Sequence, residues 1–304
     1  MTPSPSFRSP GAQHLRARLP DIGLHYVEIA ADAKPLILLH GIGMDWRVWQ
    51  ALSRRLAPYF HLYMLDMRGH GASDKPPHGY TLAHYAADIE DLLDQLHLTD
   101  TVIVGSSLGA MVAAAIEAPI DVVPYRVLVD PPMTGGPIRD STMLTDILHL
   151  KHEGVVSLTD YLASYNPGAG RFQLRSMAEM WNEAADGVIE DLLARPSDYF
   201  AIDTALRHNE SKTLIVQADP TKGGVLLDAW AERALALLPR GSLQKFPGAG
   251  HAVHAHAPRE FVKALFAFTD TSDIQQGVAG DRRLRLVRAQ RGSYNRSTRA
   301  AVEP

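Results

Sequence analysis

The chain has 304 residues, of which 46% are hydrophobic and 21% are charged. These proportions are typical of a globular protein with a large core, and they exclude a disordered or collagen-like chain. The sequence contains no cysteine, which excludes a disulfide framework, a thiolate nucleophile and a cysteine-ligated zinc ion.

The two ends of the chain differ from its body. Residues 1–20 contain arginines and prolines but no apolar stretch typical of a secretion signal, and we expect them to be flexible. Residues 271–304 have seven arginines against three acidic residues, which predicts a basic, disordered tail rather than a nucleic-acid-binding arm. No segment is long and apolar enough for a membrane span, so a cytoplasmic protein without a membrane or nucleic-acid partner is expected.

Short apolar runs that indicate buried strands alternate with helical patterns in the first half of the chain. The runs indicate strands over residues 24–29, 35–39, 62–66, 101–104 and 126–129. Helical spacing is found over residues 46–56, 81–96 and 110–118, with Thr81 as an N-cap of the second. This alternation predicts an α/β fold with a parallel, doubly wound sheet, whose ligand site lies at the carboxyl ends of the strands.

The alternation stops at Met133. Residues 133–211 have helical patterns rich in methionine and aromatic residues, which predict an inserted helical cap, or lid. Strands over 213–217 and 242–246 and helices over 227–238 and 258–268 then resume the pattern. The predicted organisation is therefore a core of residues 21–132 and 212–270 that carries the cap.

Gly105-Ser106-Ser107-Leu108-Gly109 has the GxSxG spacing and lies between a buried strand and a helix. A serine in so tight a strand-to-helix turn is exposed for reaction, and a Cβ at either glycine position would collide with a neighbouring strand or helix. The helix that follows places the positive end of its dipole near a developing anion. We predict Ser107 to be a nucleophile.

His40-Gly41-Ile42-Gly43 follows the first buried strand, where such a fold places the second half of an oxyanion hole. The expected donors are the backbone amides of Ile42 and Leu108. Glycine at position 41 lets the main chain approach a substrate carbonyl, and His40 is expected to hold the loop through hydrogen bonds.

Four motifs together resemble the α/β-hydrolase superfamily in content, order and spacing over residues 24–268. They are HGIG, LDMRGHGASDKP (residues 65–76), GSSLG and GAGH (residues 248–251). The resemblance implies an eight-stranded, mostly parallel sheet with a cap after the sixth strand, and it implies that His251 is the general base of the nucleophile. His254 and His256 are expected to be rim residues of the final loop, with no metal bound.

The acid that completes the triad has two candidates. The turn after residues 213–217 has Thr221 where the family carries an acidic residue, and Asp219 is close enough to replace it. Asp130, at the end of the strand over 126–129, matches the acid position of some lactonases and dehalogenases of the superfamily. Both alternatives stay open on the sequence.

These residues predict a serine hydrolase that cleaves a carboxylic ester or lactone through an acyl-enzyme. The alternatives are a carbon–carbon bond hydrolase with the same triad and a receptor that retains the triad. Residues expected to contact the substrate are Gly41, Met133, Tyr161 and Trp181, and the aromatic character of the cap favours an apolar group. No cofactor is implied, and the protein is expected to be a monomer or homodimer that acts on a small molecule.

Overall fold

The computed structural model describes residues 11–133, 142–166, 168–196, 199 and 202–271. The chain consists of two compact units, Met1–Val262 and Lys263–Pro304. The strands are β1 (Ala12–Arg18), β2 (Gly23–Ile29), β3 (Pro35–Leu39), β4 (His61–Leu65), β5 (Val102–Ser106), β6 (Tyr125–Val129), β7 (Lys212–Ala218) and β8 (Gly241–Phe246). The helices are η1 (Trp46–Trp49), α1 (Gln50–Leu56), α2 (Leu82–Gln95), α3 (Leu108–Ala115), α4 (Met143–Glu153), α5 (Val155–Tyr165), α6 (Arg171–Glu183), α7 (Asp186–Ala194), α9 (Asp203–His208), η2 (Pro220–Lys222), α10 (Asp228–Leu237), α11 (Val253–His256) and α12 (Pro258–Phe268).

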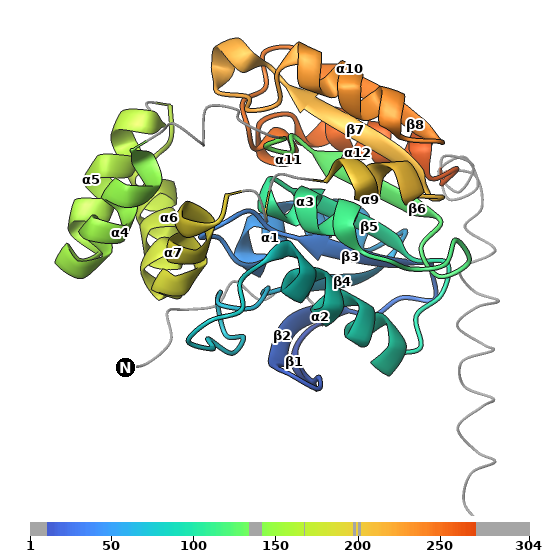
Figure 1. Cartoon of the computed structure of the whole chain (residues 1–304), viewed down its shortest axis with the longest axis horizontal. Helices are drawn as coiled ribbons and strands as arrows, with labels where there is room; N and C mark the ends of the chain where they lie inside the picture. Colours follow the sequence, from blue (N-terminus) through green and yellow to red (C-terminus); the bar gives the residue numbers. More distant parts are fainter. Residues whose placement is uncertain (1–10, 134–141, 167, 197–198, 200–201, 272–304) are drawn as a thin grey trace, which may run out of the picture. The chain divides into compact units, whose positions relative to one another are not determined.

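The strands of the first unit form one sheet in the order β1-β2-β4-β3-β5-β6-β7-β8 (Figure 1). β3 to β8 are parallel, whereas β1 and β2 are antiparallel. The apolar runs form the central strands because both faces are covered, and four of the five residues of β3 are buried. The expectation of a mostly parallel, eight-stranded sheet is confirmed.

The expectation that residues 1–20 are flexible is wrong for residues 12–18. They form β1, which pairs with β2 along its whole length, from Ala12 opposite Ile29 to Arg18 opposite Gly23. Only one residue of this edge strand is buried, so its sequence lacks the apolar alternation that would have indicated a strand. The backbone ladder, rather than side-chain burial, holds it in place. Residues 1–10 and 272–304 lie outside the described residues.

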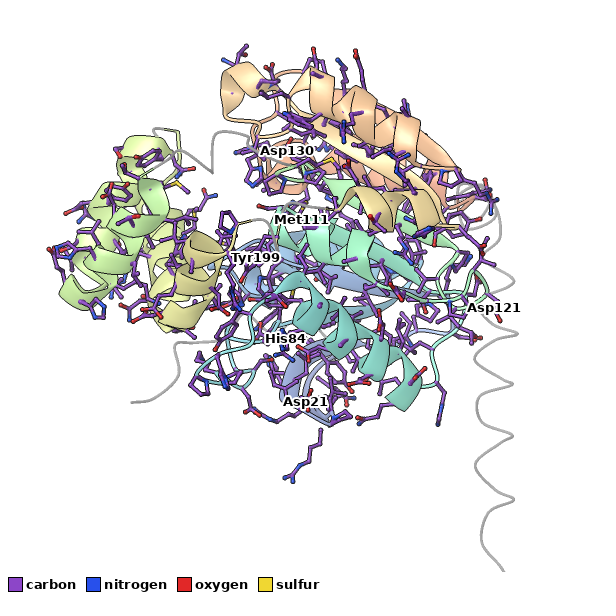
Figure 2. The ribbon with its side chains drawn as sticks, in the orientation of Figure 1. Asp21, His84, Met111, Asp121, Asp130 and Tyr199 are labelled. Atoms are coloured by element: carbon purple, nitrogen blue, oxygen red, sulfur yellow. The ribbon has the colours of Figure 1, made fainter. Side chains whose placement is uncertain are left out.

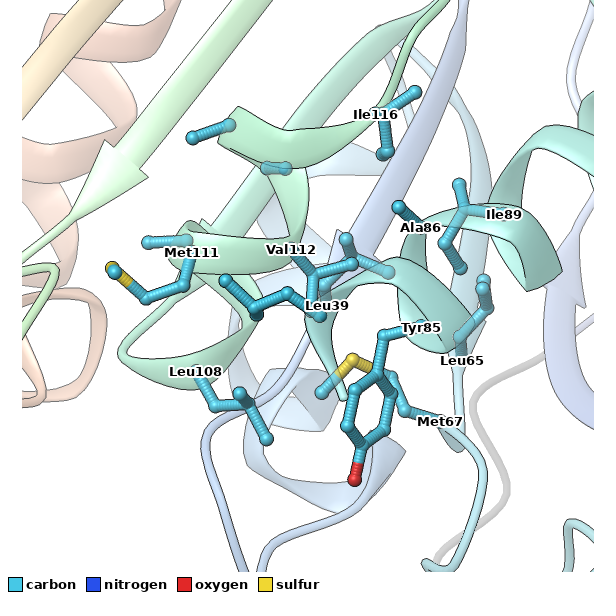
Figure 3. Packing of buried hydrophobic residues seen from close by; sticks show 14 of the residues in the cluster. Leu39, Leu65, Met67, Tyr85, Ala86, Ile89, Leu108, Met111, Val112 and Ile116 are labelled. Carbon is cyan, nitrogen blue, oxygen red and sulfur yellow. The ribbon is translucent and has the colours of Figure 1, made fainter. Parts of the chain in front are cut away.

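Helices α2, α3, α9 and α10 form one layer along the sheet, each in contact with the next (Figure 1). Figure 3 shows side chains of α2 and α3, including Tyr85, Leu108 and Val112, packed with Leu39 and Met67 in the core. α3 is buried around almost its whole circumference. This packing fixes the turn from which α3 starts.

Helices α4 to α7 contact one another and lie to the left of the sheet in Figure 1. Two hydrogen bonds tie α7 and the residue before it to core loops: the Ala185 amide donates to the Gly69 carbonyl at 2.7 Å, and Asp191 Oδ2 accepts from the Tyr80 amide at 3.1 Å. The insertion predicted to end at residue 211 also contains α9, which contacts α3 and α10 instead. Residues 134–141 of the predicted cap are outside the described part. None of the described helices has the length and apolarity needed to cross a membrane.

Candidate active site

Ser107 lies in the turn between β5 and α3 with φ +55° and ψ −117°, a conformation that serine rarely adopts. The two glycines of the motif make this turn possible. A Cβ on Gly105 would lie 2.0 Å from the Gly109 carbonyl oxygen, and a Cβ on Gly109 would lie 2.4 Å from the Leu39 carbonyl oxygen. Strand β5, helix α3 and the end of β3 therefore meet at a distance that no side chain permits.

The loop after β3 lies against this serine. A Cβ on Gly41 would be 3.2 Å from Ser107 Cβ and 3.8 Å from its Oγ. Among the described residues, the amides of Ile42 and Leu108 have no hydrogen-bond partner. Both expected oxyanion donors are thus available.

His40 fixes the orientation of one of these amides. Its Nδ1 lies 2.7 Å from the Gly41 carbonyl oxygen, which also accepts from the Met44 amide at 3.2 Å. This carbonyl belongs to the same peptide as the Ile42 N–H, and in a trans peptide the two groups point in opposite directions. Because His40 holds the carbonyl, the Ile42 N–H is directed away from His40. The loop-holding role expected of His40 is confirmed.

His251 follows β8, and its Nδ1 lies 2.7 Å from Asp130 Oδ2. The Asp130 carboxylate is fully buried and also accepts from the amides of Val225 (2.8 Å), Ala218 (3.2 Å) and Leu226 (3.2 Å). Three backbone amides and the His251 ring together fix the position of this carboxylate. Figure 2 shows Asp130 near the ends of the strands, where a parallel sheet places its ligand site.

Asp219 lies in the turn after β7 and has different partners. Its carboxylate accepts from the Thr221 amide at 2.9 Å, the Thr221 hydroxyl at 2.7 Å and the Gly248 amide at 2.8 Å. The hydrogen bonds from Gly248 and Thr221 lower the pKa of this exposed carboxyl group. Asp219 therefore connects two turns, and its bonds do not reach His251.

The predicted substrate contacts fall in different places. Trp181 of α6 is buried directly over the loop after β3, since a Cβ on Gly43 would lie 2.1 Å from its indole ring. Met133 is buried three residues after Asp130. Tyr161 of α5 instead donates to Asp146 at 2.7 Å and bonds Tyr165 at 3.1 Å, so its polar partners are all within the inserted helices.

The expectation for His254 as a rim residue is wrong. Its ring is buried and packs on Trp49, with ring centroids 4.2 Å apart. Burial lowers the pKa of His254 to about 3. This contact joins the loop that carries His251 to the helix that follows residues 40–43, the proposed oxyanion loop, and sequence spacing gave no signal for it. His256 is exposed as expected. Among the described residues, no three histidine or acidic side chains lie close enough together to hold a metal ion.

The fold, the serine in the turn after β5 and the hydrogen-bonded pair of His251 and Asp130 can now be compared with known proteins. The model of the alpha/beta hydrolase family matches residues 36–264, and the chain belongs to that family. Strands β4 to β8, the GxSxG turn and the histidine after the last strand lie inside the matched region, whereas β1 and β2 precede it.

The relatives and structural neighbours of the chain differ in the activity that they are named for. The chain is 30% identical over 277 residues to 2-(acetamidomethylene)succinate hydrolase of Mesorhizobium japonicum, covering 85% of this chain and 97% of that protein. The crystal structure of E-2-(acetamidomethylene)succinate hydrolase superimposes with a TM-score of 0.71 at 25% identity, over 85% of this chain and 99% of the other. An esterase from Exiguobacterium antarcticum has a TM-score of 0.73 at 18% identity, over 85% and 100% of the two chains, which is a likeness of fold.

Proposed function

We propose that this protein is a serine hydrolase that cleaves a carboxylic ester or lactone through an acyl-enzyme on Ser107. The observation that carries the proposal is the 2.7 Å contact between His251 Nδ1 and the buried Asp130 carboxylate. With Nδ1 engaged, Nε2 is the nitrogen left to accept a proton, and the His251 side chain is 35% exposed, as a residue that meets substrate must be. Asp130 is then the acid of the triad, and Asp219 is not.

The proposed reaction has two halves. Ser107 Oγ attacks the carbonyl carbon while its proton passes to His251 Nε2, and the amides of Ile42 and Leu108 donate to the resulting oxyanion. When the tetrahedral intermediate collapses, the carbon–oxygen bond to the alcohol breaks and His251 returns the proton to the leaving oxygen. Water, deprotonated by His251, then attacks the acyl-enzyme and releases the acid and Ser107.

Charge near the oxyanion loop supports a neutral substrate. Arg47, four residues after Gly43, binds Asp45 through Nε at 2.8 Å and through Nη2 at 2.5 Å, and Nη2 also lies 2.8 Å from Glu183. Both carboxylates neutralise this guanidinium. It therefore has little capacity left for an anionic substrate, and the indole of Trp181 over Gly43 provides an apolar wall for an ester or lactone.

A second candidate is hydrolysis of a succinate-type substrate. It is favoured by the 30% identity to 2-(acetamidomethylene)succinate hydrolase, which extends over nearly the whole of that protein. Hydrolysis of a carbon–carbon bond and a role as a small-molecule receptor would also be compatible with the triad. Substrate turnover separates these possibilities.

The test is a panel assayed with the wild type and with Ser107→Ala. We expect turnover of 4-nitrophenyl butyrate or a small aryl lactone above that of 2-(acetamidomethylene)succinate. Ser107→Ala should lower kcat by about 10⁴-fold or more, because the nucleophile is lost. Ser106→Ala, a change at the neighbouring buried serine, is the matched control and should stay within a few-fold of wild type.

Three outcomes would contradict the proposal. Preferred turnover of the succinate would make the second candidate the function. Ester turnover that survives in Ser107→Ala would remove Ser107 from its role. Tight binding of all panel compounds by the wild type without turnover would indicate a receptor.

A further inference from the structure

The stretch Leu65–Pro76 contains a histidine that the proposed chemistry does not use. His70 is fully buried in the loop between β4 and α2. Its Nδ1 lies 2.8 Å from the Arg68 carbonyl oxygen, and its Nε2 lies 3.1 Å from the Gly43 amide nitrogen. A carbonyl can only accept and a backbone amide can only donate. His70 is therefore protonated on Nδ1 and accepts through Nε2.

His40 has the same tautomer as His70, but it lies on the opposite loop of the pair. It lies on the oxyanion loop, donates from Nδ1 to the Gly41 carbonyl, and accepts through Nε2 from the Met67 amide at 3.0 Å. The rings of His40 and His70 meet edge to face, with centroids 4.8 Å apart and planes at 65°. Each loop thus contributes one histidine that accepts an amide proton from the other loop.

Both histidines are neutral acceptors at neutral pH. Burial lowers the pKa of His70 to about 3, and burial also lowers the pKa of His40. A protonated ring would have no lone pair for the Gly43 amide, so the hydrogen bond depends on this neutral form.

We propose that His70 is a positioning residue for the oxyanion hole. The inference rests on the proposed function, because it assigns the Ile42 amide to the oxyanion. His40 holds the peptide that precedes Ile42 through the Gly41 carbonyl. His70 holds the peptide that follows Ile42 through the Gly43 amide, and the two contacts together fix the direction of the Ile42 N–H.

The position of Gly43 makes this hydrogen bond necessary. Gly43 has φ +69° and is covered by the Trp181 indole, so no side chain can anchor the loop at this point. Without the acceptor on His70, the Gly43 amide would be buried without a partner and the loop would rearrange to satisfy it. The Ile42 amide would move with it.

A matched pair of substitutions separates positioning from simple loss of a hydrogen bond. His70→Gln places an amide oxygen near the site of Nε2 and can still accept from Gly43. His70→Asn places an amide N–H near the site of Nδ1 and retains only the bond to Arg68. Each variant loses one of the two hydrogen bonds, so both should have similarly lowered melting temperatures.

We expect His70→Asn to lower kcat for a 4-nitrophenyl ester by about 10- to 100-fold with KM within about twofold, because the lost interaction acts on the transition state. His70→Gln should retain kcat within about threefold of the wild type. Equal kcat in the two variants, or a change confined to KM, would overturn the inference. Ser107→Ala is assayed alongside, since residual turnover in that variant counts against the proposed function and not against His70.

A measurement on the wild type covers the case in which neither variant folds. A long-range ¹H–¹⁵N spectrum of the ¹⁵N-labelled protein reports which ring nitrogen of each histidine carries the proton. The inference requires His70 protonated on Nδ1 and bare at Nε2 at pH 7. Protonation of Nε2 would mean that the ring cannot accept from Gly43, and the assignment would be wrong.

Discussion

Ser107 and Asp130 share an unusual backbone conformation at the ends of neighbouring strands. Their φ angles are +55° and +45°, in a region that costs a residue other than glycine about 1–3 kcal/mol. Each is held by its amide to the next strand, Ser107 to the Val129 carbonyl at 2.9 Å and Asp130 to the Val216 carbonyl at 2.7 Å. The parallel sheet therefore supplies the restraint that keeps both side chains at the same edge.

Replacement of the two candidate acids should have unequal effects. Asp130→Asn is expected to lower kcat by about 10⁴-fold, because an amide cannot hold the His251 tautomer as a carboxylate does. Asp219→Asn should cost less than about tenfold, since that residue only joins the turns at Thr221 and Gly248. Both variants are assayed for kcat and for melting temperature. The reverse order of kcat losses would assign the acid to Asp219.

The sequence predicted the local part of the site and not the long-range part. Ser107 and the HGIG loop lie in turns whose geometry depends on nearby glycines, which spacing reveals. The choice between the two aspartates depends on hydrogen bonds that Asp130 accepts from the amides at positions 218, 225 and 226. The contact of His70 with Gly43 joins two loops that lie 27 residues apart in the sequence. No local pattern encodes such pairings, so these contacts could not be read from one sequence.

At the level of elements, helix α3 joins Ser107, the proposed nucleophile, to a buried cation. The helix begins after Ser107, and near its other end the Arg126 Nη1 donates to the carbonyls of Ala113 at 2.9 Å and Ile116 at 2.8 Å. Burial lowers the pKa of Arg126 to about 10. Arg126 remains protonated at neutral pH and stabilises the negative end of the helix dipole, which compensates for its removal from water.

Arg126→Met should destabilise the protein without changing its chemistry. The carbonyls at the end of α3 would be buried without donors, at a cost of about 3 kcal/mol in the free energy of unfolding. Urea denaturation measures this change. kcat of the folded variant at 15 °C should stay within a few-fold of wild type, and Arg126→Lys should lose less stability because it retains the charge. An unfolding free energy for Arg126→Met equal to that of wild type would contradict this account.

On the scale of the whole molecule, burial decided what the sequence could predict. Strands β2 to β8 fall within two residues of the predicted ranges, and in β2 to β7 this is because apolar runs mark mostly buried strands. β8, in which only Phe246 is buried, is the exception. β1 was missed since its side chains are half exposed, and α9 was assigned to the insertion because its six residues carry no sign of which surface they cover. The same burial leaves several histidines neutral inside the fold.

These histidines predict a loss of stability in acid. Burial lowers the pKa of His70 and His254 to about 3, with nearby His40 lowering the first and His251 and His256 lowering the second. In the unfolded chain a histidine binds a proton below about pH 6.5, so the unfolded state takes up more protons as the pH falls, and the free energy of unfolding decreases. Each of the two groups should contribute a loss of about 2 kcal/mol between pH 7 and pH 5. The lowered pKa of His40 acts in the same direction.

His254→Phe isolates one of these contributions. Phenylalanine keeps a ring against Trp49 and removes a buried Nδ1 that has no hydrogen-bond partner among the described residues. The variant should therefore be at least as stable as wild type at pH 7. Its free energy of unfolding, measured with urea at pH 7, 6 and 5, should decrease by about 2 kcal/mol less than that of the wild type over this range. A pH dependence identical to that of the wild type would mean that His254 takes up a proton over the same pH range in the folded protein as in the unfolded chain, and its burial would then not account for the loss of stability in acid.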